Sequence, residues 1–235
     1  MTAAPVAHPT PGDLLIRMLD AVLLDWEGVL ADTTDARQEA LVQALAAEGV
    51  RQDETAGDAA ADALALLRHS DPTLAGLVAS RATRAFAERF GRGFVMLPGA
   101  REFVERVQLA APLAIVTSAT RAETEFMLKL AGLDAAVTTI VSADDHLDPP
   151  PSAATFVQAI AQLSRRRSLN AARAVAMAQT SSALRAARAA GVRTVAIGAP
   201  AHVAVDADGA ADSIDGLRPP ELARLAGIAA AEHGA

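Results

Sequence analysis

One stretch near the N-terminus guides the interpretation of the whole chain: Val22-Leu23-Leu24-Asp25-Trp26-Glu27-Gly28-Val29-Leu30-Ala31-Asp32-Thr33. Its apolar start is typical of a buried strand, and this strand would end on the carboxylate of Asp25. A turn centred on Gly28 then leads into polar residues that favour a helix start. In parallel α/β sheets, the carboxyl ends of strands are where ligands bind. The stretch therefore predicts a functional carboxylate at Asp25.

Strand-like segments alternate with helical ones along most of the chain, which is the pattern of a parallel α/β sheet. We expect strands at 21–25, 112–117, 137–141, 173–178 and 193–197. We expect helices near 99–109, 121–131, 152–163, 181–190 and 219–232. Gly132 and Gly191 stand where a helix would end before a strand.

The segment from Thr33 to about Phe94 has a different pattern, with helical spacing and no strand signal. It is rich in Ala, Leu and Arg, and Val42, Leu45 and Ala46 fall on one helical face. It is either an ordinary helical subdomain or a cap that closes over the site. An insert directly after the first strand can hardly avoid the ligand-binding edge of the sheet, so its position favours the cap. We therefore expect a loose tail at 1–12, an α/β core at 13–33 and 94–235, and a helical cap at 34–93.

The composition excludes several classes of function. The net charge of −7 argues against broad binding to nucleic acids or anionic membranes. The chain has no cysteine, so disulfides and thiolate chemistry are ruled out. It has no apolar run of the roughly 18 residues that a membrane span needs. Residues 1–12 have neither the basic start nor the apolar core of a signal peptide. We expect a cytoplasmic protein.

Asp25 suits covalent catalysis, because a carboxylate can attack a phosphoryl or carbon centre and split one hard step into two. Alternatively, it only caps a turn. The stretch around it resembles the first signature of the haloacid dehalogenase-like (HAD) superfamily, DxDGxL, in its β-phosphoglucomutase and phosphoglycolate phosphatase branch. The resemblance implies a Rossmann-type parallel sheet with a small helical cap, and Asp25 as the nucleophile. Glu27 stands where the phosphatases carry an aspartate as general acid, and it could keep that role.

A second strand-like run ends in hydroxyl groups at a helix start: Leu113-Ala114-Ile115-Val116-Thr117-Ser118-Ala119-Thr120-Arg121. Free backbone N–H groups at a helix start favour an anion. The run resembles the second HAD motif, which implies that Thr117, with Ser118, binds phosphate. Thr117 could equally be a helix cap. Arg121 either faces the same edge as a ligand-binding residue or is a solvated helix residue.

The third and fourth HAD motifs are present as a skeleton without their charges. The third normally supplies a lysine, but Pro150 occupies that position, and the chain's only lysine is Lys129. The fourth normally supplies acids that bind Mg²⁺, but Ala178 and Gln179 occupy their places. An amide oxygen lacks the charge of a carboxylate, so we expect no cofactor, or at most weak Mg²⁺ binding at Asp25, the Glu27 backbone and Gln179.

Two functions remain open. In the first, the chain has lost ordinary Mg²⁺-dependent phosphatase activity and binds a small molecule, or a protein partner, beside Asp25. In the second, it is an enzyme that still uses Asp25 as nucleophile or base and Glu27 as general acid, either as a weak phosphatase or without metal on a small-molecule substrate. Losing both the lysine and the acids favours the first, because phosphoryl transfer depends mostly on positioning and charge stabilisation.

Overall fold

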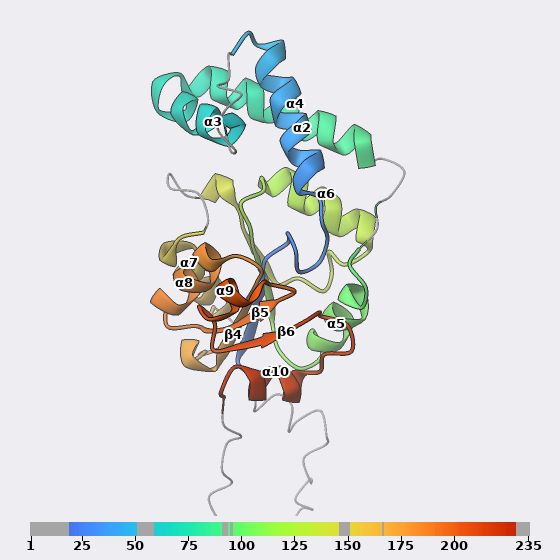
Figure 1. Ribbon diagram of the computed structural model, residues 1–235, viewed down its shortest axis with the longest axis vertical. Coiled ribbons are helices and arrows are strands. Elements are labelled where there is room, and N and C mark those ends of the chain that lie inside the picture. Colours follow the sequence, from blue (N-terminus) through green and yellow to red (C-terminus); the bar gives the residue numbers. More distant parts are fainter. Residues whose placement is uncertain are drawn as a thin grey trace, which may run out of the picture.

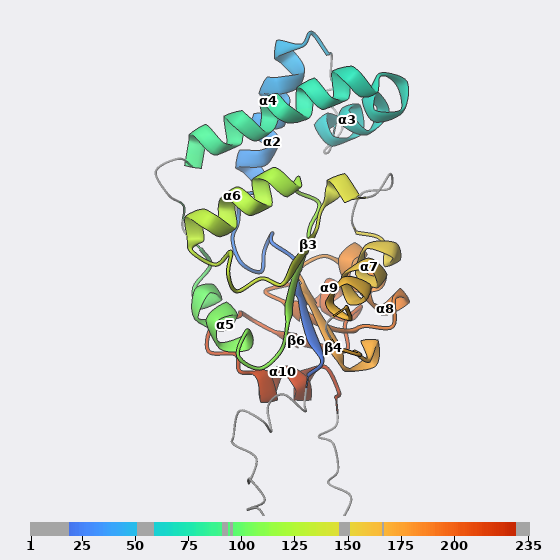
Figure 2. The same ribbon diagram turned by 180° about the vertical axis from the view of Figure 1, so that it is seen from behind.

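The structure, a computed structural model, describes residues 19–50, 59–90, 94, 96–145, 151–165 and 167–228. In these residues a parallel sheet has the strand order β3-β2-β1-β4-β5-β6 (Figures 1 and 2). The strands are β1 (Ala21–Leu24), β2 (Leu113–Val116), β3 (Thr139–Val141), β4 (Ala174–Ala178), β5 (Arg193–Ile197) and β6 (Gly209–Ala211). This is the order of a Rossmann-type sheet, so the predicted fold class is confirmed.

The five expected strands are all present, and each of their ends lies within two residues of the predicted position. The expected elements did not include β6, the short helix α9 (Ala201–Ala204) or the 3-10 helices η1 (Ala143–Asp145) and η2 (Ala171–Arg173). Strand β6 consists of Gly209, Ala210 and Ala211, which lack the β-branched and aromatic side chains that mark a strand in a sequence. The last helix, α10 (Pro219–Leu225), ends before the predicted position, and Gly227 follows it with a φ of +65°. Residues 229–232 of the prediction lie outside the described chain.

Helices cover both faces of the sheet, and the alternation of side chains along β1 shows how. Val22 and Leu24 pack into one apolar cluster, and Ala21 and Leu23 pack into another on the opposite face. This is the two-residue period of a strand buried on both faces. The first cluster includes α5 (Ala100–Val107), α6 (Arg121–Ala131) and α10, and the second includes α7 (Ala153–Leu163) and α8 (Ser181–Ala189).

Three helices between β1 and β2 form a separate group, here called the three-helix group: α2 (Thr34–Ala47), α3 (Ala59–Ser70) and α4 (Pro72–Phe90). They pack around their own apolar cluster, which includes Leu45 and Val78. The group lies beyond the end of the sheet at which β1 leads into α2 (Figure 1). The expected face of α2 was wrong in part, because Val42 and Ala46 are exposed. The helix instead buries small alanines, which allow α2 and α4 to approach closely.

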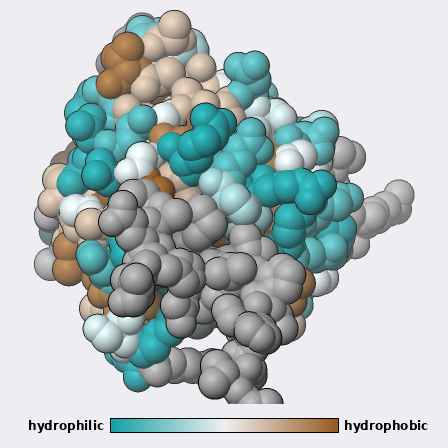
Figure 3. Space-filling view, turned by 90° about the horizontal axis from the view of Figure 1, so that it is seen from below, coloured by the Kyte–Doolittle hydropathy of each residue, from teal (hydrophilic) through white to brown (hydrophobic). Residues whose placement is uncertain are grey.

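Among the described helices, none has both the length and the apolarity required to cross a membrane. At the end of the molecule opposite the three-helix group, hydrophilic and hydrophobic residues are interspersed over the described surface that is visible (Figure 3).

Candidate active site

Three predicted site residues follow neighbouring strands of the sheet. β1 is hydrogen-bonded to β2 on one side and to β4 on the other. Asp25, Thr117 and Gln179 come directly after β1, β2 and β4. Because parallel strands end at the same edge, these three residues lie together at the carboxyl edge of the sheet. The backbone N–H of Asp25 donates to the carbonyl of Met177 at 3.0 Å, which fixes the end of β1 against β4.

The surroundings of Asp25 shift the pKa of its side chain. Burial and the nearby carboxylate of Glu27 raise the pKa of Asp25 from 3.8 to about 7. Hydrogen bonds from the backbone N–H groups of Trp26 and Glu27, and the charge of Arg37, act in the opposite direction but do not cancel the rise. At neutral pH Asp25 can therefore exchange a proton, which is what a general acid or base needs.

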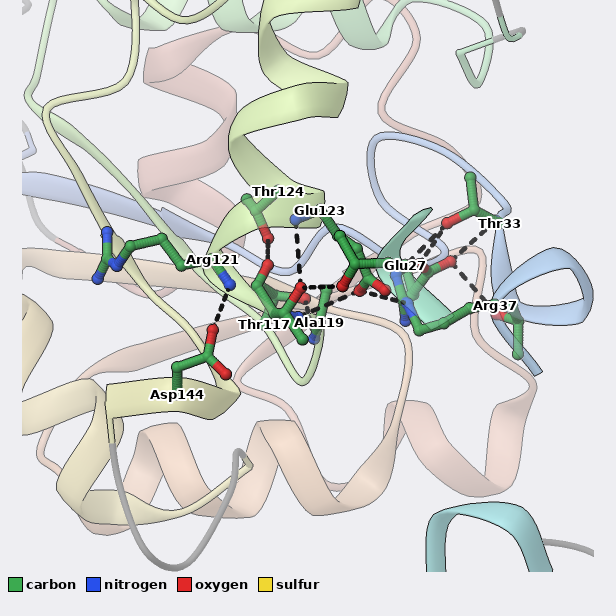
Figure 4. A network of polar contacts seen from close by, with 12 residues as sticks. Glu27, Thr33, Arg37, Thr117, Ala119, Arg121, Glu123, Thr124 and Asp144 are labelled. Carbon is green, nitrogen blue, oxygen red and sulfur yellow. Dashed lines mark hydrogen bonds and ion pairs between the residues drawn. The ribbon is translucent and has the colours of Figure 1, made fainter. Parts of the chain in front are cut away.

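The carboxylate of Glu27 is held by donors on both of its oxygens (Figure 4). Its Oε1 accepts from the Thr33 hydroxyl at 2.6 Å and from the Arg37 guanidinium. Its Oε2 accepts from the Thr33 backbone N–H at 2.9 Å and from the Thr34 hydroxyl at 3.3 Å. Groups of the protein therefore occupy both oxygens of Glu27, so a substrate would have to displace at least one of them to reach this carboxylate.

The guanidinium of Arg37 also faces a second acid, Glu123, in the first turn of α6 (Figure 4). Arg37 Nε lies 3.6 Å from Glu123 Oε2, and the Glu123 residue is 4% exposed. Burial raises the pKa of Glu123, although Arg37 and Thr120 counteract part of the rise. Glu123 was not among the predicted site residues. Its signal in the sequence is the Thr-x-x-Glu pattern of a capping box, which Thr120 and Glu123 form here.

Thr117 and Ser118 differ in exposure at the end of β2. Thr117 is buried, and its Oγ1 accepts a hydrogen bond from the Ala119 backbone N–H at 3.1 Å. Ser118 is exposed. The Thr117 hydroxyl therefore closes a local turn just before α6, whose N-cap is Thr120. Phosphate binding by Thr117 and Ser118 stays a prediction.

The chain's own carboxylates already occupy further N–H groups at the start of α6. Thr120 donates to Glu123 at 3.2 Å, and Arg121 donates to Asp144 at 2.7 Å. The Arg121 guanidinium is bound to the carboxylate of Asp145 at 2.8 Å and points away from Glu27 and Glu123 (Figure 4). An anion at this helix start would therefore compete with carboxylates of the protein, and Arg121 is engaged elsewhere.

Gln179 packs against the turn that follows β1. Its Nε2 donates to the Gly198 carbonyl at 3.3 Å, after β5. Gly28 has a φ of +71°, and a Cβ on it would overlap the Gln179 side chain. The turn therefore needs glycine both for its left-handed backbone and for this close contact. Gln179 therefore joins the turn after β1 to the end of β5 through packing and a hydrogen bond, without an ion pair.

In the part of the chain that the structure describes, no lysine lies beside Asp25. Pro150, at the position of the third motif's lysine, lies outside the described residues. Lys129 is in the last turn of α6, while the first turn lies at the carboxyl edge. Eight residues of helix place it about 12 Å further along the axis. The cation that acts on Asp25 is Arg37, from α2.

The sequence profile of the haloacid dehalogenase-like hydrolases matches residues 22–197. The chain belongs to this family. No curated protein matches it. Among solved structures, it is similar to CbbY from Rhodobacter sphaeroides, in complex with phosphate, with 22% identity, a TM-score of 0.69, and coverage of 85% of this chain and 96% of CbbY. It is also similar to β-phosphoglucomutase from Clostridium difficile, with 14% identity, a TM-score of 0.69, and coverage of 89% and 98%. At these identities the likeness supports the fold.

A third similar structure, the HAD hydrolase YfnB from Bacillus subtilis, contains magnesium and shares 15% identity over 77% of this chain and 89% of YfnB, with a TM-score of 0.55. The residues here do not fit that ion. Mg²⁺ needs hard oxygen ligands, usually with one or two carboxylates. Ala178 has no oxygen in its side chain, groups of the protein occupy the side-chain oxygens of Glu27, and Gln179 packs on Gly28. Among the described residues, no three His, Asp or Glu side chains are grouped to hold a metal.

Proposed function

We propose that this HAD-family protein binds a small molecule at the carboxyl edge beside Asp25 and no longer performs ordinary Mg²⁺-dependent phosphate-ester hydrolysis. The observation that carries the proposal is the donor set at the end of β4, where Ala178 and Gln179 replace the acids of the fourth motif. The charges near Asp25 support it, because Glu27 and Glu123 face the edge against one cation, Arg37. A phosphate dianion would meet more repulsion than attraction there.

We also propose that residues 34–93 act as the cap over this edge, and that the α/β core comprises 13–33 and 94–235. The position of the three-helix group beyond the carboxyl edge supports this division (Figure 2). The same proposal includes a cytoplasmic location and a small-molecule ligand rather than a nucleic acid or a membrane. A protein partner is the alternative to the small molecule. The net charge of −7 supports the exclusion of polyanionic partners.

A steady-state assay with phosphate esters and a few millimolar Mg²⁺ tests the loss of activity. We expect kcat/KM well below about 10⁴ M⁻¹s⁻¹, the lower end of the usual range for enzymes. Asp25→Asn is the matched control, since it removes the nucleophile and keeps the size of the side chain. Turnover above that value that disappears in Asp25→Asn would overturn the proposal. For binding, a thermal-shift screen of small molecules should yield compounds that stabilise the unmodified protein more than Asp25→Asn.

One observation favours the second candidate function, an enzyme that uses Asp25 without metal. The raised pKa of Asp25, about 7, suits proton transfer at neutral pH. Glu27 is less suited to act as the general acid, because donors occupy both of its oxygens. Hydrolytic activity in EDTA, with a pH midpoint near 7 and complete loss in Asp25→Asn, would establish this function. Its absence over a broad substrate panel would leave the binding function.

A further inference from the structure

One side chain, Arg37, joins the three-helix group to two separate parts of the core. It lies on α2, and its guanidinium contacts Glu27 in the turn after β1. The same guanidinium faces Glu123 on α6, with 3.6 Å between Nε and Oε2. The side chains of Arg37, Glu27 and Glu123 are 20%, 17% and 5% exposed. A charge pair this far out of water is screened less than a surface pair.

Other contacts between the three-helix group and the core lie beside Arg37. The Arg37 guanidinium lies 5.9 Å from the ring of Phe86 on α4. From Phe86, a run of ring contacts passes through Phe90 and Phe94 to Trp26, which follows Asp25. Thr83 on α4 lies near Thr120, 3.4 Å between their hydroxyl oxygens. Arg37 is therefore the charged centre of a largely apolar junction.

We propose that Arg37 is a latch that holds the three-helix group over the carboxyl edge by pairing with Glu27 and Glu123 at once. Arginine suits this task because its planar guanidinium presents donors in two directions, whereas lysine is a compact point charge. Moving the three-helix group away would separate Glu27 and Glu123 from the cation that they share, and the favourable charge interaction would be lost. The latch thus couples ligand access at Asp25 to a single side chain.

Because the chain has no cysteine, two introduced cysteines are its only labelling sites. Leu66→Cys on α3 and Leu109→Cys in the core replace side chains that are 69% and 78% exposed. Spin labels at these positions report the distance between the two regions by pulsed electron resonance. We expect one narrow distance distribution in the labelled parent. With Arg37→Gln added, we expect a broader distribution that includes longer distances.

Arg89→Gln is the matched control. Arg89 pairs with Glu39 within the three-helix group, so its loss should leave the distribution narrow. Arg37→Lys should give an intermediate width. If Arg37→Gln fails to fold by circular dichroism, Glu123→Gln removes the other half of the latch without leaving a buried charge, and it should broaden the distribution as well. A distribution that stays narrow in a folded Arg37→Gln or Glu123→Gln variant would overturn the latch. The measurement needs no ligand, so that result would leave the proposed function standing.

Discussion

The carboxyl edge of the sheet has two halves that differ in chemistry. After β1 and β2, the edge carries Asp25, Glu27 and, from α6, Glu123, with Arg37 among them. At the ends of β4 and β5, it carries Ala178, Gln179 and Gly198, which bring no charge. Both halves keep their backbone geometry. The comparison teaches that the sheet and its turns are continuous across the two halves, whereas the charged side chains are confined to one of them.

The largest expected effect comes from removing the charge of Asp25. A carboxyl whose pKa rises on folding stabilises the native state only while it is protonated, so this contribution is lost as the pH increases from about 4 to about 7. Asp25→Asn should therefore increase the free energy of unfolding more at pH 8 than at pH 5. The pKa change from 3.8 to about 7 sets an upper limit of about 4 kcal/mol. Urea unfolding of both proteins at the two pH values measures the difference.

The pKa of Asp145 shifts in the opposite direction to that of Asp25. Hydrogen bonds from Ser142 and Arg121 outweigh the effect of its burial and lower its pKa. Its contribution to stability is present above its ordinary pKa and is lost as the pH falls through the lowered value. Asp145→Asn should thus destabilise the protein at pH 8. If Asp25→Asn changed stability equally at pH 5 and pH 8, burial and Glu27 would not raise the pKa of Asp25 as described.

A smaller effect on stability should follow when a carboxylate is added to the uncharged half of the edge, after β4. We expect almost no change in melting temperature of the unmodified protein with a few millimolar Mg²⁺. Gln179→Asp should create a Mg²⁺-dependent increase, because it adds a carboxylate next to Asp25. Binding at about 100 times the dissociation constant would add roughly 2.7 kcal/mol. Gln179→Asn is the control, because asparagine has the size of aspartate but carries no charge. A Mg²⁺-dependent shift in the unmodified protein that vanishes in Asp25→Asn would show that the two halves still share a metal.

The smallest effect concerns the contact between Gly28 and Gln179, which joins the two halves of the edge. Gly28 and Gly49 both have a φ of +71°, but a Cβ on Gly28 would meet Gln179, whereas one on Gly49 would meet nothing. Gly49→Ala should therefore cost only the backbone penalty, about 1 kcal/mol. Gly28→Ala should cost about 1 kcal/mol more, and Gln179→Ala should relieve that excess in the double variant. Equal losses in chemical denaturation for the two alanine variants would mean that Gly28 and Gln179 do not pack as described.

The sequence predicted the sheet well, because its strands are apolar runs that end at turn residues, as at Leu24 and Asp25. It also placed the helices of the core, whose glycine ends are visible at Gly132 and Gly191. It missed β6, which is built of glycine and alanine. It also misjudged α2, because alanine gives little contrast between a buried and an exposed helical face.

The candidate site was predicted less completely, because spacing cannot show which partners a side chain finds. Asp25 and Gln179 could be located after their strands. The pairing of Arg37 with both Glu27 and Glu123 depends on α2 and α6 meeting in space, across more than 80 residues of sequence. The Thr120–Glu123 capping box is visible in the sequence, but it indicates a helix start and gives no hint of a shared arginine.

The neighbour of Asp25 has a practical consequence. Trp26 is the chain's only tryptophan, and there is no tyrosine. Its indole is 1% exposed, contacts Phe94 at a ring distance of 5.9 Å, and has no acceptor for Nε1–H among the described residues. Because phenylalanine emits only weakly, nearly all ultraviolet emission from the protein comes from one fluorophore next to the candidate nucleophile. Because indole emission responds to local electric fields, the protein carries a native optical reporter of the protonation of Asp25 and of any ligand that reaches it.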